Sequence, residues 1–147
     1  MGRILEVEMD YDINVPEKMM VVTEAEVVDS ETKKVLKCKA FWDTGATGSC
    51  ISERAARQLG LVPFAKVQLR GVDGALRKNV YVARLNIGPY TFFMQRLAEY
   101  SDVHADTDLC IGMDIIGSGD FSLTRKHGKM VLRFQIPPQY IVNSATK

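Results

Sequence analysis

Residues 41–61 read FWDTGATGSCISERAARQLGL, and this stretch decides how the rest of the chain is interpreted. Apolar residues lead into Asp43-Thr44-Gly45, and the chain then continues into a helical pattern. Asp and Gly are common turn residues, so a plain turn is the ordinary explanation of such a tripeptide. A plain turn, however, need not follow an apolar strand or lead into a helix. We therefore expect the Asp43 carboxylate at the end of a core strand, with Gly45 allowing a backbone N–H to approach it and the Thr44 hydroxyl bracing the loop.

The segments on either side of this loop predict a β-hairpin and a short helix. Residues 19–28 and 35–42 are β-branched or alternating runs separated by a polar turn, which favours a hairpin that ends at Asp43. A period of two places Leu36, Cys38, Ala40 and Trp42 on one face. We expect Trp42 to pack in the core or an interface. Beyond the loop, Ser52 is suited to cap a helix that ends at Gly60.

Most of the remaining chain also reads as short strands. Strand patterns cover residues 66–70 and 76–87 on either side of a glycine-rich tip, and residues 90–94 follow another turn. The polar stretch 98–108 is expected to be a loop. Residues 109–116 are apolar, with a second short helix around 113–117, and residues 121–123 and 130–134 predict a last hairpin. Frequent short strands predict a mainly-β barrel or sandwich-like domain.

Composition narrows the classes of function. The 147 residues fit one domain, and a net charge of +1 gives no support for nucleic-acid binding. Residues 1–31 are acidic, and we expect them to dock on a mildly basic body. The chain shows neither a signal-peptide pattern nor an apolar run long enough for a membrane span, so no membrane contact is expected.

The cysteines and histidines predict neither a metal site nor a cofactor. The chain has an odd number of cysteines, Cys38, Cys50 and Cys110, and none of them forms a CxxC pair. This pattern argues against a disulfide framework and a zinc site, and it favours a location in the reducing cytoplasm. Cys50 lies in an apolar context and is interpreted as a buried small residue rather than a nucleophile. His104 and His127 lie far apart in polar segments, where surface positions are expected.

The residues from Phe41 to Leu61 resemble the active-site block of the retropepsin-like aspartic proteases, the retroviral and retrotransposon type. Residues 109–116, LCIGMDII, are similar to the family's block before its C-terminal helix, which includes Ile111, Gly112 and Asp114. We expect Asp114 to structure the helix start. Between the two blocks, Gly71, Val72, Asp73 and Gly74 fall where the family places the tip of its substrate-binding flap.

The resemblance implies a single-domain, homodimeric acid-protease closed barrel with one or two short helices. We place this domain at residues 19–136, between an N-terminal extension (1–18) and a C-terminal tail (137–147). Retroviral members often carry an acid and an arginine where this chain has Thr47 and Met113, so that ion pair is absent. Retrotransposon-like members commonly share this departure.

The resemblance also implies an aspartic endopeptidase that acts on polypeptide substrates. This chemistry needs two carboxylates facing one water, and the chain has one Asp-Thr-Gly, so Asp43 must be joined by Asp43 of a second copy. Thr44, Gly45 and Ala46 would support the loop, with the two threonines bonding across the symmetry axis as they do in the family.

Two other functions remain open. One is a catalytically inactive dimeric module that binds extended peptide or pairs other proteins, which the intact Asp-Thr-Gly-Ala disfavours. The other treats Asp43 as a phosphoryl-accepting nucleophile, which would need phosphate- and magnesium-binding motifs that the sequence does not show.

Overall fold

Six strands close into a barrel around the main core in the computed structural model, which describes residues 3–71, 74–101 and 106–139. Pairing between β2 and β6 closes the ring. In ring order the strands are β2 (Val22–Asp29), β3 (Val35–Trp42), β8 (Leu109–Ile111), β4 (Cys50–Ser52), β7 (Tyr90–Tyr100) and β6 (Gly74–Ile87). The mainly-β, closed-barrel architecture predicted from the sequence is confirmed.

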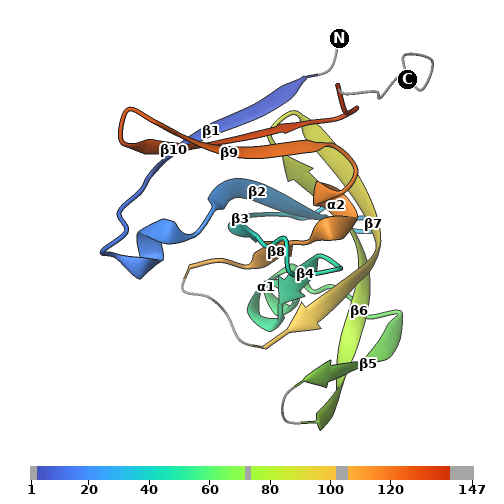
Figure 1. Ribbon diagram of the computed structural model, residues 1–147. Helices are drawn as coiled ribbons and strands as arrows, with labels where there is room; N and C mark the ends of the chain where they lie inside the picture. The colour runs from blue at the N-terminus through green and yellow to red at the C-terminus, as the bar shows by residue number, and fades with distance from the viewer. Residues whose placement is uncertain (1–2, 72–73, 102–105, 140–147) are drawn as a thin grey trace, which may run out of the picture.

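Two further β structures lie at opposite ends of this barrel (Figure 1). At one end β5 (Ala65–Gly71) pairs with the first half of β6 and forms a projecting hairpin. At the other end β1 (Ile4–Asp10), β10 (Lys129–Gln135) and β9 (Asp120–Lys126) form a three-stranded antiparallel sheet in the order β1-β10-β9, which we call the terminal sheet. The predicted last hairpin is therefore present, and its strands extend beyond residues 121–123 and 130–134.

Strand β3 shows the predicted alternation between core and surface. Cys38, Ala40 and Trp42 are buried, and Leu36 is partly buried, whereas the lysines between them are exposed. Trp42 stacks on Phe121 at 5.8 Å between ring centroids and meets Phe134 edge-on at 5.3 Å. Its indole N–H donates to Thr23 Oγ1 at 2.9 Å, which satisfies the polar atom of a buried side chain. Trp42 thus packs the terminal sheet onto the barrel.

Strand β1 was not predicted, because its glutamates and aspartates give it a weak strand signal. It pairs along its whole length with β10, and ion pairs join Glu6 to Arg133 and Asp10 to Lys129. Leu5 is buried against the core. The acidic N-terminal segment is therefore docked on basic residues, as its charge predicted, and residues 4–10 of the expected extension form part of the terminal sheet.

In the residues that the structure describes, three short helices connect the strands. In α1 (Glu53–Leu59), Ser52 Oγ accepts the Ala55 N–H at 3.0 Å, and Gly60 ends the helix with φ of 67°, as predicted from these residue types. The second predicted helix is α2 (Met113–Ile116), and a 3₁₀ turn, η1 (Pro16–Met19), was not predicted. No helix in the described part of the chain is long and apolar enough to cross a membrane.

One sequence expectation about the barrel was wrong, and one short strand was missed. Residues 98–100, expected to be loop, continue β7 and pair in parallel with β4. Glu99 made this segment look polar, but its carboxylate is buried and accepts the Tyr81 hydroxyl at 2.5 Å. Strand β4 was missed because three residues are too few to show a period.

Candidate active site

Asp43 lies immediately after β3, where a barrel strand gives way to a loop. Its backbone N–H donates to the Ile111 carbonyl at 2.9 Å, so the parallel pairing of β3 with β8 continues one residue into the loop. Its own carbonyl accepts the Ala46 N–H at 3.2 Å, which closes a tight turn. Asp43 is half-buried, and the structure thus holds its backbone while leaving the residue accessible.

Gly45 positions the Asp43 carboxylate. The Gly45 N–H donates to Asp43 Oδ1 at 2.8 Å. A Cβ at position 45 would lie 3.2 Å from that oxygen, closer than side-chain carbons normally approach. A glycine therefore allows the close approach of backbone and carboxylate that this hydrogen bond requires.

A second segment, 111–114, braces the loop that follows Asp43. The N–H groups of Met113 and Asp114 donate to the carbonyls of Ala46 and Thr47 at 2.7 and 3.1 Å. A Cβ at Gly112 would lie within 2.9 Å of backbone atoms of Gly48 and Ala46. Glycine is thus required at 112 because two stretches of main chain are in contact there.

Ser49 and Asp114 complete this brace. The Asp114 carboxylate accepts the Ser49 N–H at 2.9 Å and the Ser49 hydroxyl at 2.7 Å, and Ser49 Oγ accepts the Gly112 N–H at 3.0 Å. Asp114 also accepts the N–H of Ile115 within its own helix. Asp114 therefore connects α2 to the Asp43 loop. The sequence analysis expected Asp114 only to structure the start of its own helix. Ser49, which is buried, has no local sequence signal that would have marked it.

Two open cavities flank the braced loop. One, of about 720 Å³, is bordered by Thr44 and by Met113, Ile116, Gly119, Asp120 and Phe121. The other, of about 780 Å³, lies between Thr47 and Gly48 on the loop and residues 91–96 of β7. Thr44 is exposed at the first cavity, so its side chain is accessible from outside the chain.

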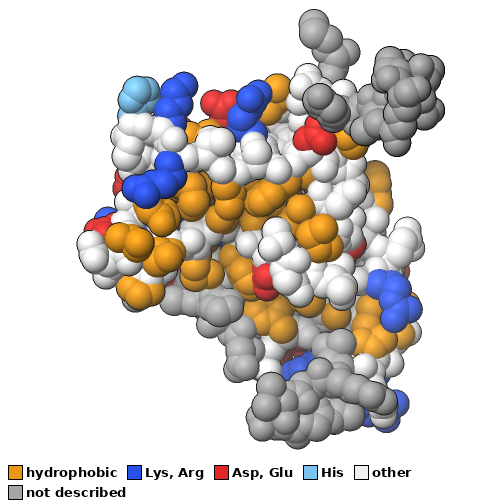
Figure 2. All heavy atoms as spheres, in the orientation of Figure 1, with side chains coloured by type: hydrophobic (Ala, Val, Ile, Leu, Met, Phe, Trp, Pro, Cys, Tyr) orange, Lys and Arg blue, Asp and Glu red, His pale blue; other side chains and the backbone are white. Residues whose placement is uncertain are grey.

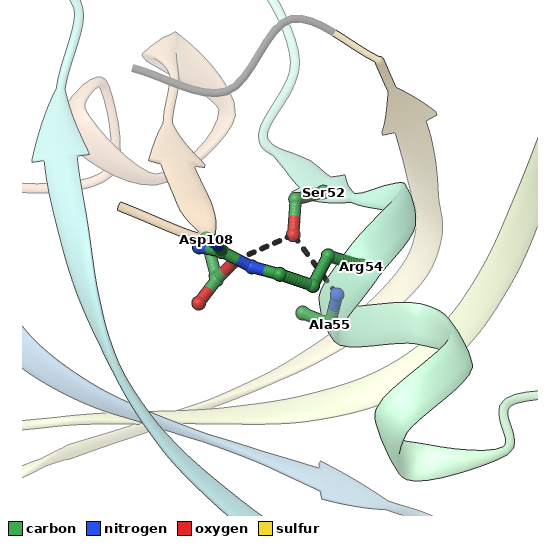
Figure 3. A network of polar contacts seen from close by, with 4 residues as sticks. All are labelled: Ser52, Arg54, Ala55 and Asp108. Atoms are coloured by element: carbon green, nitrogen blue, oxygen red, sulfur yellow. Dashed lines mark hydrogen bonds and ion pairs between the residues drawn. The ribbon is translucent and has the colours of Figure 1, made fainter. Parts of the chain in front are cut away.

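A polar network fixes the start of α1 (Figure 3). Asp108, just before β8, accepts the Ser52 hydroxyl at 2.7 Å and the Arg54 guanidinium at 2.8 Å. Ser52 is fully buried and also caps the helix through Ala55. Asp108 was not singled out by the sequence, because nothing in the local pattern links it to residues more than fifty positions earlier.

The flap residues are described only in part. Gly71 and Gly74 pair in register as the last residues of β5 and the first of β6. Val72 and Asp73 lie outside the described residues. A hairpin is thus present where the sequence placed the flap, and its position is at the end of the molecule opposite the terminal sheet (Figure 1).

The surroundings of the three cysteines disfavour the ionised thiolate, because burial raises the pKa of each thiol. Burial, followed by the nearby carboxylate of Asp108, raises the pKa of the Cys38 thiol to about 12, and burial with the neighbouring Cys50 raises the pKa of Cys110 to about 12. Burial also raises the pKa of Cys50. The sequence predicted a buried residue at this position, and the structure shows Cys50 half-buried. His127 is exposed in the β9–β10 turn, as predicted, and His104 lies outside the described residues.

Comparison with known proteins agrees with this geometry. The family model described as "Aspartyl protease" matches residues 25–115. Among solved structures, a retropepsin-like aspartic protease from Rickettsia conorii is similar at 15% identity and a TM-score of 0.55, covering 92% of this chain and 95% of that one. EIAV protease in complex with the inhibitor HBY-793 is similar at 17% identity and a TM-score of 0.50, covering 73% and 90%. No curated protein matches significantly. The chain therefore belongs to the aspartyl protease family and has the retropepsin-like fold.

Proposed function

We propose that this protein is an aspartic endopeptidase that acts as a homodimer, with Asp43 of each subunit as its catalytic pair. The observation that carries the proposal is the Asp43 carboxylate, bound by the Gly45 N–H at 2.8 Å at the end of a core strand. The loop after Asp43 is held by hydrogen bonds from residues 112–114, and a catalytic side chain needs such a rigid support to keep its geometry. Family membership supports the same reaction class.

Hydrolysis by this chemistry uses two carboxylates with one proton between them. The ionised carboxylate takes a proton from water, the water oxygen attacks the peptide carbonyl carbon, and the protonated carboxylic acid gives its proton to the carbonyl oxygen. The tetrahedral intermediate then collapses, as the amide nitrogen takes a proton from the pair and the C–N bond breaks. Two carboxylates about 3 Å apart do not both ionise, so the pair holds the shared proton. The chain carries one Asp-Thr-Gly, and Asp120 lies on β9 rather than behind a core strand, so the second carboxylate comes from a second copy.

The remaining residues have supporting roles in this proposal. Thr44 meets its symmetry mate across the axis, where its exposed position leaves it accessible. Ala46 anchors the loop through its contacts with Asp43 and Met113. Ile111, Gly112 and Asp114 hold the loop from behind, through Asp43 and Ser49.

The substrate is an extended polypeptide bound between the catalytic pair and the β5–β6 hairpin, whose tip is Gly71, Val72, Asp73 and Gly74. An extended peptide offers main-chain hydrogen bonds to such a hairpin, and covering the site excludes water. The related EIAV protease was solved with an inhibitor bound, which supports a ligand cleft in this fold. Free cysteines suit a reducing compartment, so we place the activity in the cytoplasm.

Peptide-library cleavage between about pH 3 and about pH 7 tests the proposal, with a statine-type inhibitor as control. Asp43→Asn should abolish cleavage and keep the circular dichroism spectrum of the native protein. The matched control, Asp12→Asn, changes a surface loop aspartate and should cleave normally. Hydrolysis that persists in Asp43→Asn would refute the assignment. A folded dimer without inhibitor-sensitive cleavage would favour the non-catalytic module.

A further inference from the structure

Strand β7 has an open main-chain edge over residues 91–96, which we call the β7 edge. On one side β7 pairs with β6, and β4 takes up the other side only from residue 98 onward. In the described part of the chain, no backbone hydrogen bond joins residues 91–96 to a segment other than β6. Thr47 and Gly48 of the Asp43 loop border the same cavity of about 780 Å³ as this edge. An open edge of this kind can take up an extended polypeptide as a further strand.

The turn between β6 and β7 determines which main-chain groups face the β7 edge. The residues that flank Gly88-Pro89 are paired, and a Gly88 φ of 56° followed by proline is typical of a type II′ turn. The pair that flanks such a turn is hydrogen-bonded, and hydrogen-bonded pairs alternate along an antiparallel ladder. The N–H and C=O groups of Phe92 and Met94 therefore point to β6, whereas those of Thr91 and Phe93 point to the open edge.

The side chains at the β7 edge are apolar and basic. Phe93 is 72% exposed, Arg96 borders the cavity, and Arg84 lies opposite Phe93 in the register with β6. Among the described residues neither arginine belongs to an ion pair, and Arg84 Nε is buried without a hydrogen-bond partner. Asp114 also borders the cavity, but its carboxylate already accepts the N–H and the hydroxyl of Ser49. Hydrophobic and basic side chains border the right-hand side of the molecule in Figure 2, where Figure 1 draws β6 and β7.

We infer that the β7 edge binds a second extended segment of the polypeptide substrate, outside the residues held at the catalytic pair, and that this segment carries an acidic residue near an apolar one. This inference rests on the proposed function. Through Thr47 and Gly48 the cavity offers a chain bound at the catalytic pair a path to β7. The added strand forms main-chain hydrogen bonds with Thr91 and Phe93, places an apolar side chain beside Phe93, and pairs its acid with Arg96.

A β-bulge limits the length of this site. The register with β6 shifts between Tyr81 and Ala83, which leaves Gln95 and Arg96 opposite a single residue, and β7 then pairs with β4. Bulges commonly terminate an open stretch of strand. At about 3.3 Å per residue the β7 edge is about 20 Å long, which accommodates a segment of about six residues.

A probe peptide tests the β7 edge without any need for cleavage. The probe is a fluorescein-labelled peptide of about ten residues, alternating valine and threonine around one glutamate, and fluorescence anisotropy at low salt measures its dissociation constant. Arg96→Glu should raise this constant about tenfold and Phe93→Ala about fivefold. The control Arg57→Glu reverses an exposed charge on α1 and should bind like the native protein. Binding should persist with a statine-type inhibitor present, and a probe that the inhibitor displaces would overturn the inference.

Hydrogen exchange followed by NMR locates the probe at single residues. In the free protein the N–H groups of Thr91 and Phe93 should exchange fast, and the bound probe should slow both. Those of Phe92 and Met94, which point to β6, should exchange slowly with and without the probe. Unchanged exchange at Thr91 and Phe93 with the probe bound would overturn the inference. A native oligomer that Phe93→Ala dissociates in sedimentation equilibrium would also overturn it, because the edge would then bind another copy of the chain.

Lengthened substrates separate this inference from the proposed function. A library peptide that is cleaved is joined to the probe sequence at either end through a flexible glycine-serine linker. The better of the two should have a KM about tenfold lower and an unchanged kcat, because contacts remote from the reacting bond are equal in the ground and transition states. Arg96→Glu should remove this gain. Cleavage without any gain would overturn the β7 edge site alone, whereas probe binding without cleavage of any peptide would support the edge site and refute the proposed function.

Discussion

Gly112→Ala is the substitution that most sharply tests how the two motifs are joined. An added Cβ would lie 2.7 Å from both the carbonyl carbon and oxygen of Gly48, and 2.9 Å from the Ala46 oxygen. All three are backbone atoms, so the clash cannot be relieved by turning a side chain. Overpacking of this kind costs about 1–3 kcal/mol. Displacing the hydrogen bonds from Gly112 to Ser49 and from Met113 to Ala46 costs about 1 kcal/mol each.

The free energy of unfolding should therefore fall by about 3–5 kcal/mol in Gly112→Ala. At about 3 °C per kcal/mol for a chain of this size, Tm should fall by about 9–15 °C. Urea denaturation and thermal melts measure both quantities. Gly48→Ala is the matched control, because a Cβ there meets nothing within 4 Å, and it should change stability by less than about 1 kcal/mol. A Gly112→Ala variant as stable as Gly48→Ala would refute the close contact.

Two further predictions concern the brace and the buried thiols. Asp114→Ala leaves the N–H and the hydroxyl of buried Ser49 without their acceptor. The free energy of unfolding, measured by urea denaturation, should therefore fall by about 2–3 kcal/mol. A loss below about 0.5 kcal/mol would contradict the role of Asp114 in bracing the loop. Burial raises the pKa of the Cys110 thiol to about 12 in the folded protein, whereas the unfolded thiol ionises near 9.0. The stability that the protonated thiol contributes is therefore complete below about pH 9 and is lost as the pH rises toward about 12. Between about pH 8 and about pH 10 the native protein should lose more stability than Cys110→Ala, by at most about 1.4 kcal/mol per pH unit. Equal losses of stability in the native protein and in Cys110→Ala would contradict the raised pKa of Cys110.

The barrel and the Asp43 loop could be predicted because their signals are local. The alternation of Leu36, Cys38, Ala40 and Trp42 indicates a half-buried strand whatever it pairs with. The Ser52 cap and the Gly60 terminus likewise depend on residues within one helix. The block around Gly112 was found through a resemblance, and the structure gives its physical reason in the contact with Gly48.

The missed elements depend on partners that are distant in the chain. Strand β1 is stabilised by pairing with β10, more than one hundred residues later, so its own acidic sequence shows little. Residues 98–100 begin a stretch that is polar in sequence, but Glu99 is buried against the Tyr81 hydroxyl. Ser49 and Asp108 are likewise bound to side chains more than fifty positions away. Such contacts leave no period or motif in a single sequence.

Mixing native subunits with Asp43→Asn subunits tests the central claim, that each subunit gives one carboxylate to a shared site. The amount of native protein is held constant, at a concentration where dimers predominate. Random pairing predicts that an equal amount of Asp43→Asn lowers cleavage to about half, and a ninefold excess to about a tenth. Cleavage that stays constant while native and variant subunits exchange freely would contradict the account, because one Asp43 would then suffice.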